Sequence, residues 1–387
     1  MEGDRDNVRL YAPGPAYVPE RIRAAMAEPL VHHRTAAFKA LLADIRARLK
    51  QLWHAEAWEP LVFCCSGTGV MEGAVVNFMR RDAKALVVSA GKFGERWTRI
   101  LTAYGCQPIE LNLPWGRAVE PEPVLRLLEQ HPDVRAVYLT SADTSTGVEH
   151  AVDRLGPLIR AHTDALIVVD AVCDFGGARN FWPIEWGFDV VVSCSQKCLL
   201  LSPGLTLAHV SPRAWRFCES ADLPRFYFDW RVERAKQEKE LITAWTSPVS
   251  LFRGLQESLT MLQEEGIDNV AARYARSGQA FRAAVSALHL TLFPERSTNA
   301  LSVVCCPTGV DGTAVVALAQ DRYRVRLSNG QDGLKGKVFR VGHMGFLTEG
   351  DILGLVHVVE RTLADLGYRG EAGMALAAAQ RSFLSAP

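Results

Sequence analysis

Ala165-Leu166-Ile167-Val168-Val169-Asp170 is a run of aliphatic and β-branched residues that ends in a carboxylate. A second apolar run covers residues 188–192, and Ser195-Gln196-Lys197 follows it closely. Short runs with this composition are typical of strands that are buried on both faces, as in a parallel sheet. Two such strands would deliver a carboxylate and an amine to the same end of one sheet.

Short apolar runs alternate with longer amphipathic stretches over the first part of the chain. We predict buried strands at residues 85–89, 136–141, 165–169, 190–193 and 205–210, and helices at 96–104, 122–130 and 155–162. This alternation indicates an α/β fold with a mostly parallel sheet and helices on both of its faces. Ligands of such sheets bind at the carboxyl ends of the strands, where Asp170 and Lys197 are expected.

The pattern changes after about residue 245. Long helical patterns cover 248–266 and 269–288, and they lead into strands at 290–293, 301–305, 324–327 and 338–341 and helices at 312–323 and 348–366. These elements indicate a second, smaller α+β unit. We therefore expect an N-terminal arm at 1–20, a large domain at 21–250 and a small C-terminal domain at 251–387. The Ala-rich segment 370–387 is either a helix or a frayed end.

The charges of the chain balance, with 43 basic and 43 acidic residues among 387. This balance argues against a nucleic-acid partner and a polybasic membrane anchor, and it favours small-molecule partners. The first residues form no apolar segment, and no apolar stretch approaches the roughly 18 residues of a membrane-spanning helix. We expect a soluble, cytoplasmic protein that does not bind a membrane.

Nine cysteines give an odd number, and no two of them form a Cys-x-x-Cys pair. Several lie within apolar strand runs, where a free thiol behaves as a small hydrophobic side chain. We therefore predict reduced core cysteines, with neither disulfides nor a metal site.

Lys197 and Asp170 are informative only as a pair. A lysine just past a strand is usually solvated, and an aspartate in that place usually caps a helix or forms a turn. An amine that forms an imine and a carboxylate that pairs with a pyridinium nitrogen are, however, the two groups that a pyridoxal phosphate site needs. The sequence therefore suggests this cofactor.

A possible phosphate site lies in Ser66-Gly67-Thr68-Gly69, which follows the apolar run 61–64 and opens a helix that extends to about residue 79. A small, Gly-rich turn at a helix N-terminus exposes backbone N–H groups, and the helix dipole favours an anion there. The motif alone is weak. It lacks the Gly-Lys-Ser/Thr of a nucleotide P-loop and the spacing of a dinucleotide fingerprint.

Eight motifs occur in the order and approximate spacing of one family: YAPGPAYVP, CSGTGVME, GKFGER, DTSTGVEH, VVDAVCDFGG, SCSQK, WTSPVSL and FRVGHMG. Through them the chain, from about residue 11 to about 366, resembles the class V aminotransferases, in particular their alanine–glyoxylate and serine–pyruvate branch. The resemblance implies the fold type I architecture of pyridoxal-phosphate-dependent transferases, with a mainly parallel seven-stranded sheet in the large domain and a smaller α+β C-terminal domain. It also implies a homodimer whose active sites are shared between subunits.

The resemblance assigns roles to individual residues. Lys197 would form the Schiff base with pyridoxal 5'-phosphate and act as the base that moves the α-proton, and Asp170 would pair with the ring nitrogen. Arg340 would bind the substrate α-carboxylate, which a bidentate guanidinium suits better than an amine does. The remaining cofactor-binding residues would be Ser66, Gly67, Thr68 and Gln196 at the phosphate, Thr246 from the partner subunit, Val172 and Phe93 on the ring faces, and Ser145 near the ring hydroxyl. His343 and Met344 would be structural.

The chain departs from the family at several positions. Ser141-Ala142-Asp143 replaces His-Gly-Glu, Asp174 replaces a serine, and Phe93 stands where many relatives have tryptophan. Thr243 replaces an aromatic residue, and Tyr17, which could narrow the pocket, replaces a small polar one. An extra carboxylate near the cofactor would repel acidic side chains, so one hypothesis is that the substrates are not the alanine and glyoxylate pair, or that the later chemistry differs. Ordinary drift is the alternative.

The implied function is an aminotransferase that moves an amino group between an amino acid, or a related amine, and a 2-oxo acid. A lyase or a β/γ-replacement enzyme with the same cofactor is the main alternative, because the same electron sink supports both. A cysteine desulfurase is disfavoured, since Gln196 stands where those enzymes have histidine and residues 327–330 contain no cysteine. A non-catalytic homologue would have no reason to keep Lys197, Asp170 and Arg340 together. The natural substrates stay open.

Overall fold

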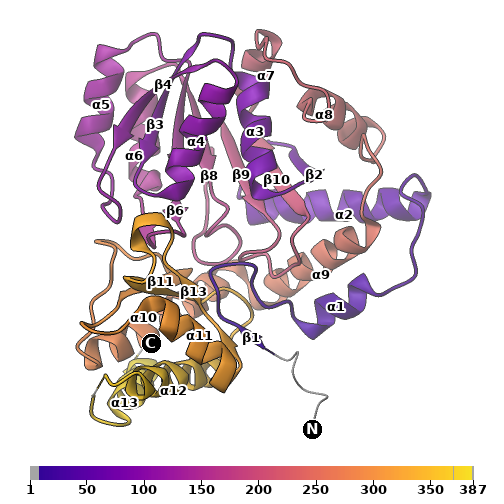
Figure 1. Cartoon of the computed structure of the whole chain (residues 1–387). Coiled ribbons are helices and arrows are strands. Elements are labelled where there is room, and N and C mark those ends of the chain that lie inside the picture. The colour runs from indigo at the N-terminus through magenta and orange to yellow at the C-terminus, as the bar shows by residue number, and fades with distance from the viewer. Residues whose placement is uncertain (1–7, 369, 386–387) are drawn as a thin grey trace.

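A seven-stranded sheet forms the centre of the computed structural model, which describes residues 8–368 and 370–385 (Figure 1). In spatial order its strands are β2 (Pro60–Cys64), β10 (Leu205–Val210), β9 (Val190–Cys194), β8 (Leu166–Asp170), β5 (Ala136–Thr140), β3 (Lys84–Ser89) and β4 (Gln107–Asn112). Strand β10 is antiparallel to both of its neighbours, and all other adjacent pairs are parallel. The predicted α/β fold with a mainly parallel sheet is confirmed.

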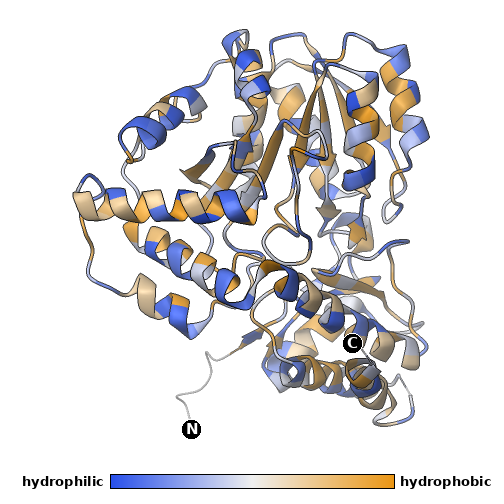
Figure 2. Cartoon of the chain, turned by 180° about the vertical axis from the view of Figure 1, so that it is seen from behind, coloured by the Kyte–Doolittle hydropathy of each residue, from blue (hydrophilic) through white to orange (hydrophobic). Residues whose placement is uncertain are grey.

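The strands other than the edge strand β4 contribute alternate side chains to two hydrophobic clusters. In β8, Ile167 and Val169 face one cluster, and Leu166 and Val168 face the other. The first cluster is covered by α2 (Ala36–Leu52), α5 (Pro121–Gln130) and α6 (Val152–His162), and the second by α3 (Gly67–Phe78), α4 (Lys92–Ala103), α7 (Pro212–Glu219) and α8 (Trp230–Lys239). The central strands are therefore mostly apolar, as Figure 2 shows, because neither face of the sheet meets water there.

Strand β4 was not predicted from the sequence. It lies at the edge of the sheet, and its residues alternate between exposed and partly buried positions. Its sequence, Gln107-Pro108-Ile109-Glu110-Leu111-Asn112, therefore lacks the continuous apolar run that marks the central strands.

The C-terminal part of the chain forms a smaller α+β unit, which lies below the central sheet in Figure 1. Its antiparallel sheet has the order β11 (Leu301–Cys305), β14 (Val338–Gly342), β13 (Ser328–Asn329), and its helices are α10 (Ile267–Ala287), α11 (Gly312–Tyr323), α12 (Glu349–Asp365) and α13 (Met374–Ser385). The predicted helix at 312–323 is confirmed without change. The predicted strand at 290–293 is wrong, because only a single bridge joins Leu292 to Val304.

The N-terminal arm connects this unit to the large sheet. Strand β1 (Arg9–Leu10) pairs with β12 (Val325–Arg326), and the N–H of Gly342 donates to the carbonyl of Tyr11 at 2.6 Å. Farther along, the N–H of Ala16 donates to the carbonyl of Gln196 at 2.9 Å. The arm thus crosses from the C-terminal unit to the loop that carries Lys197.

Helix α1 (Glu20–Met26) follows the N-terminal arm in the chain, and helix α9 (Val249–Glu265) follows the strands of the large sheet. The buried face of α9, with Phe252 and Leu255, belongs to the same hydrophobic cluster as Phe38 and Leu42 of α2. The division of the chain at residues 20 and 250 stays a prediction.

All nine cysteines carry free thiols. Five of them are buried, as predicted for core cysteines, but Cys64 is exposed because it ends β2 at the rim of the sheet. Among the described residues, no helix combines the length and the apolar composition needed to cross a membrane.

Candidate active site

The predicted acid and amine, Asp170 and Lys197, lie at the carboxyl ends of two strands of the sheet. Asp170 is the last residue of β8, and Lys197 stands three positions after β9 ends at Cys194. The two strands are parallel neighbours, with Asp170 opposite Val192. The sequence prediction that both residues come to the carboxyl ends of adjacent strands is therefore confirmed.

The carboxyl group of Asp170 is buried, with only 3 % of the residue exposed. Its Oδ1 accepts a hydrogen bond from the N–H of Val172 at 2.9 Å. Burial raises the pKa of Asp170 to about 6, and the negative charge of Asp143 adds to this effect. The Val172 N–H and the charges of Arg96 and Lys197 lower the pKa in part. A cation beside Asp170 would therefore be stabilised by its carboxylate.

The amine of Lys197 is held by the N-terminal arm. Its Nζ donates a hydrogen bond to the carbonyl of Pro13. The next residue, Gly14, has φ of +122°, and any Cβ at this position would overlap the Lys197 side chain. A glycine is thus required where the arm passes over the amine. The adjacent Gln196 has a buried Oε1 with no hydrogen-bond partner among the described residues.

The predicted phosphate turn begins helix α3. Ser66 is its N-cap, and the Ser66 Oγ accepts a hydrogen bond from the N–H of Gly69 at 3.3 Å. A Cβ on Gly67 would lie 3.7 Å from the Val172 side chain. The turn is therefore close to the segment that follows Asp170. The first N–H groups of α3 have no partner within the helix, and they can bind an anion.

Asp143 organises the opposite side of the site. Its Oδ2 accepts from the N–H of Phe93 at 2.8 Å, and its Oδ1 accepts from the N–H and the Oγ of Ser145 at 2.9 and 2.5 Å. The N–H of Lys92 in turn donates to the Ser145 Oγ at 3.0 Å. Burial raises the pKa of Asp143, and the hydrogen bonds from Ser145 and Phe93 oppose this shift. One carboxylate therefore holds two of the predicted cofactor-binding residues.

Arg340 lies on β14 and faces the same loop. Its Nε donates to the carbonyl of Asn329 and its Nη1 to the carbonyl of Thr144, both at 2.8 Å. Burial lowers the pKa of Arg340 to about 10, and Asp143 partly offsets this effect. Within the described residues, no hydrogen bond of Nη2 is found, so this end of the fork is available to a further acceptor.

One residue of the site was missed by the sequence analysis. Arg96, in the first turns of α4, donates from Nη1 to the Thr68 Oγ1 at 3.1 Å, and its Cζ lies 4.5 Å from the centre of the Phe93 ring. The sequence Gly91-Lys92-Phe93-Gly94-Glu95-Arg96 could have indicated this role. Phe93 and Arg96 are three residues apart, and residues with this spacing share one face of a helix.

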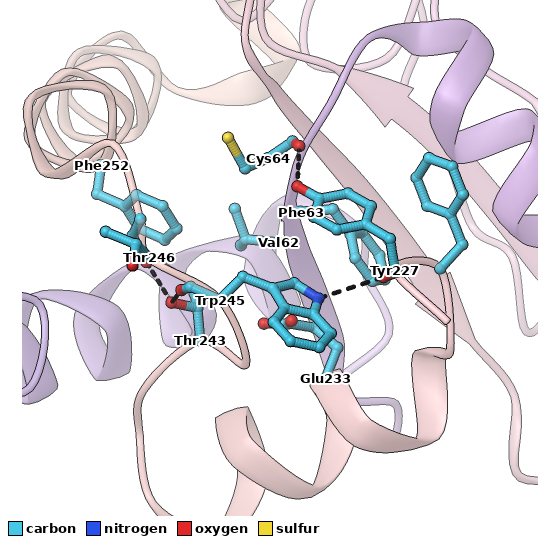
Figure 3. A pocket seen from close by; sticks show the side chains of 11 residues that line it. Val62, Phe63, Cys64, Tyr227, Glu233, Thr243, Trp245, Thr246 and Phe252 are labelled. Atoms are coloured by element: carbon cyan, nitrogen blue, oxygen red, sulfur yellow. Dashed lines mark hydrogen bonds between the residues drawn. The ribbon is translucent and has the colours of Figure 1, made fainter. Parts of the chain in front are cut away.

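Thr246 is not brought to this site within one chain. It lines a separate small cavity with Cys64, Tyr227 and Phe252 (Figure 3). The neighbouring Thr243 Oγ1 donates to the carbonyl of Trp245 at 2.7 Å and is hydrogen-bonded to Ser247. Thr243 therefore stabilises the turn that presents Thr246.

Asp174 and Tyr17 do not face the site. Asp174 has no exposed surface, and its Oδ2 accepts from the Ser141 Oγ at 2.6 Å. Tyr17 is 41 % exposed and lines a surface pocket with Phe346. Asp174 is therefore sequestered, whereas the charge of Asp143 acts on both Asp170 and Arg340. The hypothesis that an extra carboxylate repels acidic substrates stays a prediction.

The buried His343 packs against Phe281 of α10 in the C-terminal unit, and Met344 belongs to the hydrophobic cluster that the unit shares with the central sheet. The Nε2 of His343 is hydrogen-bonded to the Ser302 Oγ at 2.9 Å, and burial lowers the pKa of His343 to about 3. Met344 is also buried. Both residues thus have the surroundings of structural residues.

The burial of Asp174 predicts a pH effect on stability. Its pKa is raised, mainly by burial, from 3.8 to about 7, and among the described residues its Oδ1 has no hydrogen-bond partner. Because the folded pKa exceeds the unfolded one, the contribution of Asp174 to stability is complete below pH 3.8 and is lost as the pH rises to about 7. The free energy of unfolding of Asp174→Asn, minus that of the native chain, should therefore rise between these pH values. Urea titrations at several pH values measure this difference.

Asp153→Asn is the matched control for Asp174→Asn. The carboxylate of Asp153 contacts Arg179 at 3.1 Å, and the charge of Arg179 also acts on Asp174, but Asp153 is much more exposed. A constant difference between Asp174→Asn and the native chain at all pH values would contradict the prediction.

The chain resembles characterised families over most of its length. The family model of the class V aminotransferases matches residues 19–345. The small subunit of a soluble hydrogenase from Synechococcus is 38 % identical, over 97 % of this chain and 98 % of that one. L-aspartate–glyoxylate aminotransferase from Paracoccus denitrificans is 33 % identical, over 97 % and 96 % of the two chains.

A solved structure shares the fold closely. The alanine–glyoxylate aminotransferase of Nostoc superimposes with a TM-score of 0.86 and 30 % identity, over 92 % of this chain and 95 % of that one. Because the superposition covers 92 % of this chain, most of the described fold is common to the two proteins.

Proposed function

This chain belongs to the class V aminotransferase family, and we propose that it moves an amino group between an amino acid and a 2-oxo acid with pyridoxal 5'-phosphate bound at Lys197. Members of this family are pyridoxal phosphate enzymes. The observation that carries the proposal is the placement of Asp170 and Lys197 at the ends of adjacent parallel strands. Arg340 faces the same region from the C-terminal unit.

The residues present fit this cofactor. Asp170 is a buried carboxylate with a raised pKa, and a protonated ring nitrogen would offset the cost of its burial. The side-chain N–H groups of Gln196 and the N–H groups in the first turn of α3 can donate to a phosphate, whereas the Gln196 Oε1, which has no partner among the described residues, is an acceptor and is not a phosphate contact. We assign the phosphate to Ser66, Gly67, Thr68 and Gln196, the ring faces to Phe93 and Val172, and the ring hydroxyl to Ser145.

The cofactor, when bound, supplies an electron sink for the bond that breaks at the α-carbon. Lys197 would hold the cofactor covalently, and once the amine of the donor had displaced it, its free Nζ would take up the α-proton. Asp170 would keep the ring nitrogen of the bound cofactor protonated. Arg340 holds the substrate carboxylate and so fixes the α-carbon within reach of the amine.

We further propose that glyoxylate is the amino acceptor. Two proteins similar to this chain, from Paracoccus and Nostoc, are named for transfer to glyoxylate. The amino donors in those names differ, and this chain's donor stays open.

We propose a homodimer in which Thr246 reaches the phosphate of the partner subunit. Phe226, Tyr227 and Trp245 form an aromatic cluster beside this residue, and Phe226 is 79 % exposed. Exposed apolar clusters of this kind are typical of protein interfaces. We also propose a cytoplasmic location, where the nine free thiols would stay reduced.

The proposal is tested by following the absorbance of the purified protein. We expect a yellow protein whose long-wavelength band is bleached by an amino donor and restored by glyoxylate. Release of ammonia and a 2-oxo acid without any acceptor would instead favour the lyase or replacement alternative. A protein that stays colourless with added cofactor would contradict both enzymatic functions.

Arg340→Lys should lower kcat/KM for carboxylate substrates by about 10- to 100-fold, because an amine cannot replace the paired contact of a guanidinium with two carboxylate oxygens. The loss should lie mainly in KM and should be absent for an amine that lacks a carboxylate. Steady-state kinetics with both substrate types measure this, with the exposed Arg322→Lys as control. Equal losses for the two substrates would contradict the assigned role.

A further inference from the structure

Arg96 connects the first turn of α4 to the first turn of α3. It lies three residues after Phe93, and its guanidinium carbon is 4.5 Å from the centre of that ring. Its Nη1 donates to the Thr68 Oγ1 at 3.1 Å. The cation–π contact and the hydrogen bond together hold the guanidinium against the turn to which we assign the phosphate.

The charge of Arg96 is not neutralised by a carboxylate of the described residues, whereas the neighbouring Lys92 is paired with Glu95 at 3.7 Å and with Asp332. The Arg96 side chain is only partly exposed. Its positive charge acts within the site, where it lowers the pKa of Asp170. A partly buried cation without an ion pair is an available partner for an anion.

The other groups assigned to the phosphate carry no net charge. Ser66, Thr68 and Gln196 offer hydroxyl and amide groups, and the N-terminus of α3 contributes the equivalent of about half an elementary charge. A phosphate monoester carries up to two negative charges at neutral pH. The site as assigned so far leaves most of that charge uncompensated.

We propose that Arg96 is a further cofactor-binding residue, whose guanidinium pairs with the phosphate at the N-terminus of α3. The proposal rests on the proposed function, since it assumes that a phosphorylated cofactor binds there. It deepens that function by assigning the main positive charge of the phosphate site to α4, which also carries Phe93. One helix would then recognise both the ring and the phosphate of the cofactor.

The test compares the binding of pyridoxal phosphate with that of pyridoxal, which has the ring but no phosphate. Dissociation constants are measured by quenching of tryptophan fluorescence for the native chain, Arg96→Gln, Arg96→Lys and the control Arg99→Gln, whose residue is exposed on the same helix. Arg96→Gln should bind pyridoxal phosphate about 10- to 100-fold more weakly, as expected for the loss of a charge-assisted hydrogen bond. Its affinity for pyridoxal should change by less than about 3-fold.

Arg96→Lys should recover part of the affinity, because it keeps the charge but loses the planar fork. A second readout needs no cofactor: inorganic phosphate should raise the Tm of the cofactor-free native chain and of Arg99→Gln more than that of Arg96→Gln.

Two results would overturn the assignment. Arg96→Gln could bind pyridoxal phosphate with native affinity, or it could lose equal affinity for pyridoxal phosphate and pyridoxal, which would mean that Arg96 acts on the ring and not on the phosphate. If instead the native chain binds neither ligand and no adduct forms at Lys197, the proposed function itself fails.

Discussion

Lys197→Ala is expected to lower the turnover of amino donors by at least about 10⁴-fold, because it removes both the covalent attachment of the cofactor and the base at the α-carbon. The variant should still bind pyridoxal phosphate through the remaining contacts, but without the spectrum of the attached cofactor. Single-turnover kinetics measure the loss. Borohydride reduction followed by peptide mass spectrometry should find the cofactor on residue 197 of the native chain and on no residue of the variant.

Lys197→Arg is the matched control, since Lys197 also donates to the carbonyl of Pro13 in the arm. Arginine keeps a cationic donor for that carbonyl but does not form the covalent bond. Both variants should therefore be inactive, with similar thermal stability for the arginine variant and the native chain. Activity above about a tenth of the native level in Lys197→Arg would mean that the lysine acts only by holding the arm.

Asp170→Asn is expected to reduce kcat by about 10²- to 10³-fold, the effect of removing one partner from a buried ion pair. The neutral amide keeps the size of the side chain and an acceptor for the N–H of Val172, but it cannot keep the ring nitrogen protonated. Asp170→Glu, which retains the charge, should recover part of the loss. Rate measurements with the three proteins at saturating cofactor provide the comparison.

The stability of Asp170→Asn separates chemistry from folding. The folded pKa of Asp170, about 6, lies above its ordinary value of 3.8, so its contribution to stability is complete below pH 3.8 and lost as the pH rises through 6. Measured without cofactor, the variant should gain stability relative to the native chain over this pH range. An inactive variant that is also unstable above pH 6 would argue for a structural role instead.

The central sheet could be predicted because burial on both faces leaves a signature within a few consecutive residues. The run 165–169 needs no knowledge of the rest of the chain to indicate a strand, and the polarity of Asp170 marks its end. The edge strand β4 carries no such run, since one side of it meets solvent. The segment 290–293 had a suitable composition, but it has only one bridge, to β11, and no ladder.

The candidate site could be predicted only in part. The positions of Lys197, Asp170 and Ser66 follow from local patterns and from the order of strands. The contact of Lys197 with Pro13 joins residues 184 positions apart, and no periodicity in the sequence encodes it. Asp143 attracted attention only as a departure from the family, and its four hydrogen bonds to Phe93, Gly94 and Ser145 emerge from the packing of two loops.

The path of the N-terminal arm has a consequence for biosynthesis. Among the described residues, strand β1 pairs with β12 alone, at Val325–Arg326, and the carbonyl of Tyr11 accepts from the N–H of Gly342. A ribosome must therefore have translated most of the message before residues 9–13 can close over the amine of Lys197. Because contacts between distant parts of a chain form late, we expect the nascent polypeptide to build its sheet well before it completes the pocket proposed for the vitamin B6 coenzyme.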